Sequence, residues 1–278
     1  GVIAAMMNKS RSLVATQFHP EVHHTKDGLK MLENFLLKIA DCQSNWTAGN
    51  FINDQIEKIR NFVGDGSVLT GVSGGVDSTV VAALLHKAVG SRSHAVIIDH
   101  GLMRKNEVSE CVDALADGLG VNIHSYDESK IFLSKLKGVV DPEKKRKIIG
   151  NQFIYSFDRI AMSLGKIEYL AQGTLYPDKI ESGVSNGNTS QVIKSHHNVG
   201  GLPENMEFKL VEPLDELFKD EVREVGKELG LPSKLINRHP FPGPGLGVRI
   251  IGEITQERIK ILQEADRIYM DILLEDNI

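Results

Sequence analysis

The stretch Val68-Leu69-Thr70-Gly71-Val72-Ser73-Gly74-Gly75-Val76-Asp77-Ser78-Thr79 decides how this chain folds. Its first residues have the apolar pattern of a buried strand. After the glycines, residues 80–85 form an apolar run that is typical of a helix. A strand, a tight turn and a helix are therefore predicted in that order. Gly74 and Gly75 let the backbone approach an anion closely, in front of a helix N-terminus that carries partial positive charge. We interpret the turn as a phosphate-binding site.

Asp77 is the unusual member of this turn. A carboxylate beside a polyphosphate repels it unless a hard cation lies between them, and Mg²⁺ is the usual cation. We therefore expect Asp77 to bind Mg²⁺ and the turn to bind Mg-ATP, with hydroxyl donors from Ser73, Ser78 and Thr79. The spacing differs from the GxxxxGK[ST] loop of kinases and GTPases, so the lysine that would reach the outer phosphates is absent from the motif.

The segment from Ser73 to Thr79 resembles the signature loop of the ATP pyrophosphatase superfamily, whose members cleave ATP between its α and β phosphates and bind the departing pyrophosphate. NAD synthetases, asparagine synthetases, argininosuccinate synthetases and tRNA-modifying enzymes share this loop. Taken alone, a Ser/Gly cap on an ordinary helix is the alternative. The resemblance implies that ATP contacts Gly71, Ser73, Gly74, Gly75, Val76, Asp77, Ser78 and Thr79.

Composition narrows the class of protein. The chain has 278 residues, 41% hydrophobic and 25% charged, as in ordinary globular proteins. We see no signal peptide and no apolar run near the ~20 residues that span a bilayer, so a cytoplasmic location without a membrane partner is expected. The net charge of −5 argues against a nucleic-acid partner. Cys42 and Cys111 lie too far apart in sequence to indicate a disulfide framework or a zinc site.

Residues 1–46 predict two strands, at residues 2–7 and 12–18, followed by an amphipathic helix. His19 and Glu21 follow the second strand. An imidazole oriented by a carboxylate can take a proton from a nucleophile, although a His-Pro-Glu turn on a surface is more often only a turn.

The segment Gln17-Phe18-His19-Pro20-Glu21-Val22 resembles the closing signature of class I glutamine amidotransferases. In that family the His and Glu serve a cysteine on a Gly-x-Cys-x-Gly elbow, and this chain contains no such elbow. We interpret residues 1–46 as the C-terminal remnant of a glutaminase domain with a linker. His19 and Glu21 would then be catalytic residues without their nucleophile, and we predict no glutamine hydrolysis by this chain alone.

Strand and helix patterns alternate through residues 47–239, with further strands predicted at residues 94–98, 121–124 and 169–172. This alternation predicts an α/β fold with a doubly wound parallel sheet that binds ligands at the carboxyl ends of its strands. Polar turns follow two of these strands, at residues 99–101 and 172–174. Either of these turns alone is more often an ordinary turn than a ligand site.

A Gly/Asn/Ser-rich stretch from Ser182 to Gln191 leads to Lys194, His196 and His197. We expect a flexible lid with a basic tip, which would offset the charge of ATP and exclude water. The paired histidines lack a third ligand at a suitable spacing, so a metal site there is disfavoured.

Several segments closely resemble the glutamine-hydrolysing GMP synthase family, and the match extends over essentially the whole chain: residues 142–150, 172–182, 182–191, 193–198, 212–214, 218–223 and 238–246. The resemblance implies that Mg-ATP adenylates the 2-oxygen of xanthosine monophosphate (XMP) and releases pyrophosphate. Ammonia from glutamine then attacks C2, AMP leaves, and GMP is formed.

The same resemblance assigns roles to residues outside the phosphate turn. ATP would also contact Ile97, Asp99, Gly101 and Gly173. XMP would contact Arg146, Gly243 and Gly245. The catalytic lid would comprise Asp178, Glu181, Lys194, His196 and His197, and its position would be set by Lys219, Asp220 and Glu221.

Residues 240–278 resemble the start of the family's dimerisation domain, so the full-length protein is expected to be a homodimer. The family's Lys and Glu contacts to the nucleotide near the end of that domain are not in this sequence, and we expect the chain to bind Mg-ATP but to use XMP poorly. Two alternatives stay open: a related enzyme with another acceptor, such as an NAD synthetase, and a non-catalytic ATP-binding fragment.

Overall fold

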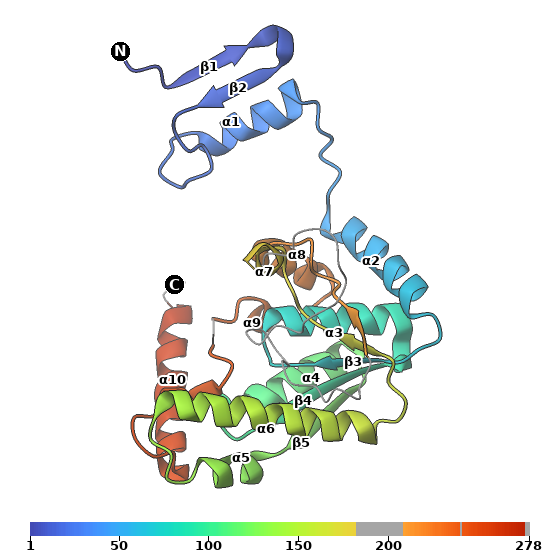
Figure 1. Cartoon of the computed structure of the whole chain (residues 1–278), viewed down its shortest axis with the longest axis vertical. Helices are drawn as coiled ribbons and strands as arrows, with labels where there is room; N and C mark the ends of the chain where they lie inside the picture. Colours follow the sequence, from blue (N-terminus) through green and yellow to red (C-terminus); the bar gives the residue numbers. More distant parts are fainter. Residues whose placement is uncertain (182–207, 240, 276–278) are drawn as a thin grey trace. The chain divides into compact units, whose positions relative to one another are not determined.

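The computed structural model describes residues 1–181, 208–239 and 241–275 (Figure 1). Contacts divide the chain into two compact units, Gly1–Thr47 and Ala48–Ile278. No helix in the described ranges is long and apolar enough to cross a membrane.

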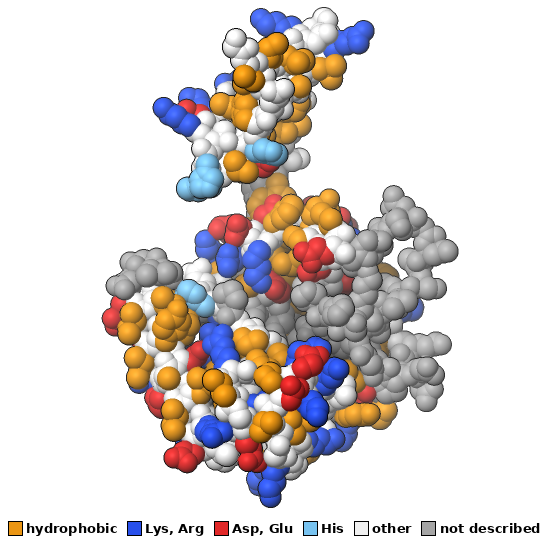
Figure 2. Space-filling view, turned by 60° about the vertical axis from the view of Figure 1, so that its left-hand side comes forward, with side chains coloured by type: hydrophobic (Ala, Val, Ile, Leu, Met, Phe, Trp, Pro, Cys, Tyr) orange, Lys and Arg blue, Asp and Glu red, His pale blue; other side chains and the backbone are white. Residues whose placement is uncertain are grey.

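The first unit is a hairpin followed by a helix. Strand β1 (Ala5–Asn8) pairs antiparallel with β2 (Leu13–Thr16) across a 3₁₀ turn, Lys9–Arg11. Helix α1 (Gly28–Asn34) continues as one π-helical turn, Phe35–Ile39. Both strands and the helix confirm the sequence pattern. Within residues 1–47 only Gly28 is buried, and hydrophobic side chains of this unit are exposed on the surface drawn in Figure 2.

The second unit contains a five-stranded sheet in the order β5-β4-β3-β6-β7, and every neighbouring pair is parallel. The strands are β3 (Val68–Gly71), β4 (Ser93–Asp99), β5 (Ile123–Asp127), β6 (Tyr169–Ala171) and β7 (Lys209–Val211). Since side chains alternate along a strand, Val68 and Ile97 join one core cluster, whereas Leu69 and Ile98 join another on the opposite face.

Helices cover both faces of this sheet (Figure 1). The first core cluster includes α2 (Ala48–Val63), α3 (Val76–Val89), α4 (Glu107–Leu119) and α8 (Lys219–Glu228). The second includes α5 (Ser129–Leu136), α6 (Pro142–Ser163) and the N-terminal turn of α10 (Gln256–Glu275). The remaining short helices are Gly90–Arg92, α7 (Tyr176–Glu181), α9 (Ser233–Ile236) and Gly245–Val248. The predicted doubly wound α/β fold is confirmed.

The strand order positions the site. From β3 the chain adds β4 and β5 on one side, and then crosses to the other side of β3 to add β6 and β7. In open parallel sheets a ligand crevice forms where the order reverses, outside the carboxyl ends of the strands. That point lies between β3 and β6, where the phosphate turn and the turn at Gln172–Thr174 begin.

Candidate functional site

The predicted phosphate turn connects β3 to α3. Gly74 has a φ of 74°, a left-handed conformation that favours glycine, and Gly75 is the N-cap of α3. The Ser73 N–H donates to Ser78 Oγ at 3.2 Å, and the Ser78 hydroxyl donates to the Gly75 carbonyl at 3.1 Å. The Thr79 hydroxyl donates to the same carbonyl at 2.7 Å and is buried, so Thr79 supports the helix start from inside the core.

Asp77 lies in the first turn of α3, with its two carboxylate oxygens in different surroundings. Oδ2 accepts from Lys219 Nζ at 2.6 Å, whereas Oδ1 is buried and has no hydrogen-bond partner among the described residues. Mg²⁺ is typically bound by one or two carboxylates together with phosphate oxygens and water. One open, buried carboxylate oxygen beside the turn therefore fits the predicted cation, although no cluster of three metal-binding side chains occurs in the described ranges.

Gly173, after β6, faces the same carboxylate. A Cβ at Gly173 would lie 3.1 Å from Asp77 Cβ and 3.5 Å from the Ser78 nitrogen, so the two turns approach each other at the predicted crevice. The following residues form a polar segment: Thr174 donates to Glu212 at 2.5 Å, and Asp178 accepts from the Leu175 N–H at 2.9 Å. Glu181 is exposed at the end of α7.

Three predicted lid residues, Lys194, His196 and His197, lie outside the described residues. Lys219 was expected to position that lid. In the structure Lys219 pairs with Asp77, a contact across 142 residues of sequence. Asp220 pairs with Arg223 at 2.8 Å, and Glu221 accepts from the Phe218 N–H at 2.8 Å to cap α8.

A hollow of about 460 Å³ opens at the carboxyl ends of β4 and β5. Asp99 and Gly101 line it together with Met103 and Val108, which combines polar and apolar surface suited to a nucleoside. Asp99 also accepts from the Gly101 N–H at 2.8 Å and so fixes the turn. Ile97 is fully buried in the core and does not line the hollow.

The residues predicted for XMP are less closely grouped. Arg146 is exposed on α6, where its guanidinium forms two hydrogen bonds of 2.8 and 2.9 Å with Glu143. Gly243 is exposed, with open space around its Cα. Gly245 is buried and has a φ of 66°. A side chain at this position would collide with Leu102 and His100.

His100, beneath Gly245, provides a prediction about acid stability. Burial lowers its pKa from 6.5 to about 4, and its Nδ1 accepts from the Leu102 N–H at 3.1 Å. Between these two pKa values the unfolded chain binds the proton and the folded chain does not, so the free energy of unfolding should fall as pH drops from 6.5 to 4. The contribution is about 3 kcal/mol at full effect.

The measurement is chemical denaturation of the chain and of His100→Asn over pH 4–7. The Asn variant should be less stable at neutral pH. Its free energy of unfolding should fall less between pH 6.5 and 4 than that of the parent chain. Equal slopes in the two proteins would contradict the assignment.

His19 and Glu21 lie in the first unit, where His19 Nδ1 is 2.9 Å from a Glu21 carboxylate oxygen. A backbone hydrogen bond and then the His19 side chain lower the pKa of Glu21, which keeps the carboxylate ionised. The loop packs closely against Gly28, where a Cβ would lie 2.0 Å from the Pro20 carbonyl oxygen. The pair therefore has the geometry of an oriented imidazole.

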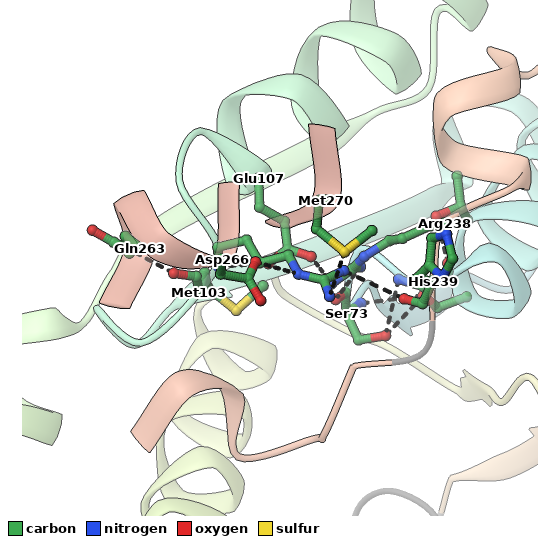
Figure 3. A network of polar contacts seen from close by, with 12 residues as sticks. Ser73, Met103, Glu107, Arg238, His239, Gln263, Asp266 and Met270 are labelled. Carbon is green, nitrogen blue, oxygen red and sulfur yellow. Dashed lines mark hydrogen bonds and ion pairs between the residues drawn. The ribbon is translucent and has the colours of Figure 1, made fainter. Parts of the chain in front are cut away.

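A polar network lies beside the phosphate turn (Figure 3). The sequence did not predict it. The guanidinium of Arg238 forms an ion pair with Glu107 and donates to the Ser73 carbonyl at 3.4 Å. Arg104 pairs with Asp266 of α10 at 2.9 Å. Three guanidinium groups surround the ring of Phe241, with centroid distances of 4.4, 5.3 and 5.5 Å: those of Arg104, Arg249 and Arg238.

Two family models match parts of this chain. The model described as NAD synthase matches residues 47–154, and the model described as Glutamine amidotransferase class-I matches residues 1–39. These matches cover the phosphate turn and the His19–Glu21 segment respectively.

Curated relatives match over nearly the whole chain. A glutamine-hydrolyzing GMP synthase of Symbiobacterium thermophilum is 55% identical across 97% of this chain and 52% of the relative. That of Staphylococcus saprophyticus is 54% identical across 99% of this chain and 53% of the relative. The chain therefore spans about half the length of the curated relatives it matches.

Solved structures share the fold at low identity. The NMN synthetase of Francisella tularensis superposes with a TM-score of 0.53 at 16% identity, covering 80% of this chain and 94% of that chain. The NH3-dependent NAD synthetase of Campylobacter jejuni gives 0.51 at 17% identity, covering 83% of this chain and 88% of that chain.

Proposed function

This chain is a homologue of the glutamine-hydrolysing GMP synthases over about half of their length, and from this premise we propose that it carries the ATP-binding and adenylating part of such a ligase. In the proposed reaction, Mg-ATP adenylates the 2-oxygen of XMP and pyrophosphate leaves. Ammonia, normally supplied from glutamine, then attacks C2 and AMP leaves, giving GMP. Adenylation converts a poor leaving group into a good one, which lowers the barrier for a neutral nitrogen nucleophile.

The observation that carries the proposal is the phosphate turn at the switch point of the sheet. The turn places backbone N–H groups and the N-terminus of α3 at the crevice. Gly173 closes the opposite side without a side chain. Asp77 Oδ1 would hold Mg²⁺, and the bound ion would offset the negative charge of the polyphosphate.

Lys219 and the hollow complete the proposed ATP site. The Lys219 ammonium lies beside Asp77, close enough to the turn to stabilise charge on departing pyrophosphate. The hollow lined by Asp99 and Gly101 would take the adenosine. The hydroxyls of Ser73 and Ser78 lie 3.2 Å apart and would hold the turn around the phosphates.

Within this proposal, the residues of the XMP site and of the lid are assigned from the sequence resemblance to the GMP synthase family. Arg146 would contact the XMP phosphate after exchanging its Glu143 partner, and Gly243 and Gly245 would also contact XMP. Asp178 and Glu181 would belong to the lid. Cytoplasmic location and homodimerisation of the full-length protein are likewise part of the proposal.

Calorimetric titration with Mg-ATP, followed by an assay for AMP, tests the function. The chain should bind Mg-ATP, and continuous formation of AMP and pyrophosphate should require both XMP and ammonium, at a rate below that of relatives twice its length. Release of ADP would contradict the proposal. Turnover with the NAD synthetase acceptor instead of XMP would favour that enzyme class, and binding without AMP would favour a nucleotide-binding fragment.

Glutamine should not support the reaction in this 278-residue chain, because the sequence has no Gly-x-Cys-x-Gly elbow to supply the nucleophile. Burial raises the pKa of the Cys111 thiol to about 11, which makes it a poor nucleophile at neutral pH. We expect no glutamate from glutamine in an enzyme-coupled assay, with ammonium as the positive control for the synthetase step. Glutamate release at a rate that depends on His19 would overturn this prediction.

A further inference from the structure

The position of Arg238 beside the phosphate turn has a consequence for how that turn binds its ligand. Its side chain is 13% exposed and pairs with Glu107, whose side chain is 7% exposed. Glu107 is itself fixed, because its other carboxylate oxygen accepts from the Arg104 N–H at 2.9 Å. The guanidinium is therefore anchored at one end before it reaches the turn.

The other end of the guanidinium contacts the turn through its backbone. Arg238 Nη1 donates to the Ser73 carbonyl at 3.4 Å. The Ser73 carbonyl and the Gly74 N–H belong to one planar trans peptide, so they point in opposite directions. A donor that holds the carbonyl on one side therefore aims the Gly74 N–H away from Arg238.

Hydrogen bonds within the turn leave this N–H available. The Ser73 N–H donates to Ser78 Oγ and the Gly75 N–H donates to Ser73 Oγ, at 3.2 and 3.4 Å. The Gly74 N–H has no acceptor within the described part of the chain. A peptide next to two successive glycines can rotate readily, because glycine populates both signs of φ. A contact from outside the turn can therefore fix its orientation.

We propose that Arg238 is a positioning residue that fixes the Ser73–Gly74 peptide, so that the Gly74 N–H is directed at the outer phosphates of bound ATP. This inference rests on the proposed function of the site. Glu107 holds the Arg238 guanidinium by an ion pair, and Phe241 holds it by a cation–π contact, with 5.5 Å between Arg238 Cζ and the ring centroid. In Figure 3, Arg238 and Ser73 lie together, with Glu107 above them.

Binding of Mg-ATP and of AMP by Arg238→Gln tests the proposal, because AMP has the adenosine but lacks the outer phosphates. We expect Mg-ATP affinity to fall about 10-fold or more, the effect of losing one hydrogen bond to a charged group. AMP affinity should change less than about 2-fold. Arg238→Lys should also weaken Mg-ATP binding, because an ammonium cannot hold Glu107 and the Ser73 carbonyl with the same fork geometry.

Arg249→Gln is the matched control. It removes another guanidinium from the same ring of Phe241, but Arg249 pairs with Asp266 and has no contact with the turn among the described residues. Its Mg-ATP affinity should equal that of the parent chain. Thermal unfolding of each variant shows whether the fold is retained.

Glu107→Gln separates positioning from direct phosphate binding. Because Glu107 also lines the hollow, AMP is titrated as well. If Arg238 acts through the Ser73 carbonyl, loss of its anchor weakens Mg-ATP binding more than AMP binding. If Arg238 binds phosphate directly, removing its anionic partner strengthens binding, which would overturn the proposal. Unchanged Mg-ATP affinity in Arg238→Gln, or equal losses for Mg-ATP and AMP, would also overturn it. Failure of the parent chain to bind Mg-ATP would instead reject the proposed function.

Discussion

Replacing Asp77 by Asn should lower the Mg²⁺-dependent formation of AMP about 100-fold or more, the scale seen when one electrostatic group is removed from a transition-state site. The carboxylate supplies the buried, open oxygen that we assign to the cation. Asn keeps the shape but removes the charge. Without Mg²⁺, binding of ATP should not weaken, because the substitution removes a repulsive anion and frees the Lys219 ammonium.

Initial rates and titrations with and without Mg²⁺ measure both effects. Asp65→Asn is the matched control, since Asp65 is exposed before β3, at the end of the strand opposite the turn. Equal Mg²⁺ dependence of the parent and Asp77→Asn proteins would show that the cation is held elsewhere.

Replacing Gly74 by Ala should have the second largest effect, a loss of Mg-ATP affinity of at least about 10-fold. The left-handed φ of 74° costs an L-residue roughly 1–2 kcal/mol. A Cβ there would also lie 2.7 Å from Arg238 Nη1, so either the guanidinium or the turn has to move. Calorimetric titration with Mg-ATP measures the loss.

Gly138→Ala separates backbone strain from the effect on the site. Gly138 has the same φ of 74°, but a Cβ added there would have no neighbouring atom within 4 Å. Both variants should lose the stability that the left-handed φ costs an L-residue, while only Gly74→Ala loses Mg-ATP affinity. Equal affinity losses would mean that general destabilisation explains both.

Local sequence features predicted the fold well. The strand, turn and helix around Ser73 lie where the apolar pattern placed them, because glycine conformation and helix capping act over a few residues. Some strand boundaries needed correction. The strand expected at residues 2–7 begins at Ala5, the strand expected at residues 121–124 begins at Ile123, and β7 was not predicted.

Side-chain partners distant in sequence could not be predicted. The Lys219–Asp77 pair and the Arg238–Ser73 contact join residues 142 and 165 positions apart, and nothing in either segment encodes the other. Lys145 shows the same limit. A basic run like that at Lys144–Lys147 usually forms a solvated face, yet the Lys145 ammonium is buried and donates to two carbonyls at 2.6 Å, those of Ile250 and Gly252. Only the packing of α6 on the loop before α10 creates that site.

The most direct test is a crystal structure of the chain with Mg²⁺ and an ATP analogue whose α–β bridging oxygen is replaced by methylene. We predict that its outer phosphates contact the Gly74 N–H and the Ser73 and Ser78 hydroxyls, with Mg²⁺ on Asp77 Oδ1 and adenosine in the hollow beside Asp99. A triphosphate bound away from the β3–α3 turn would contradict the account.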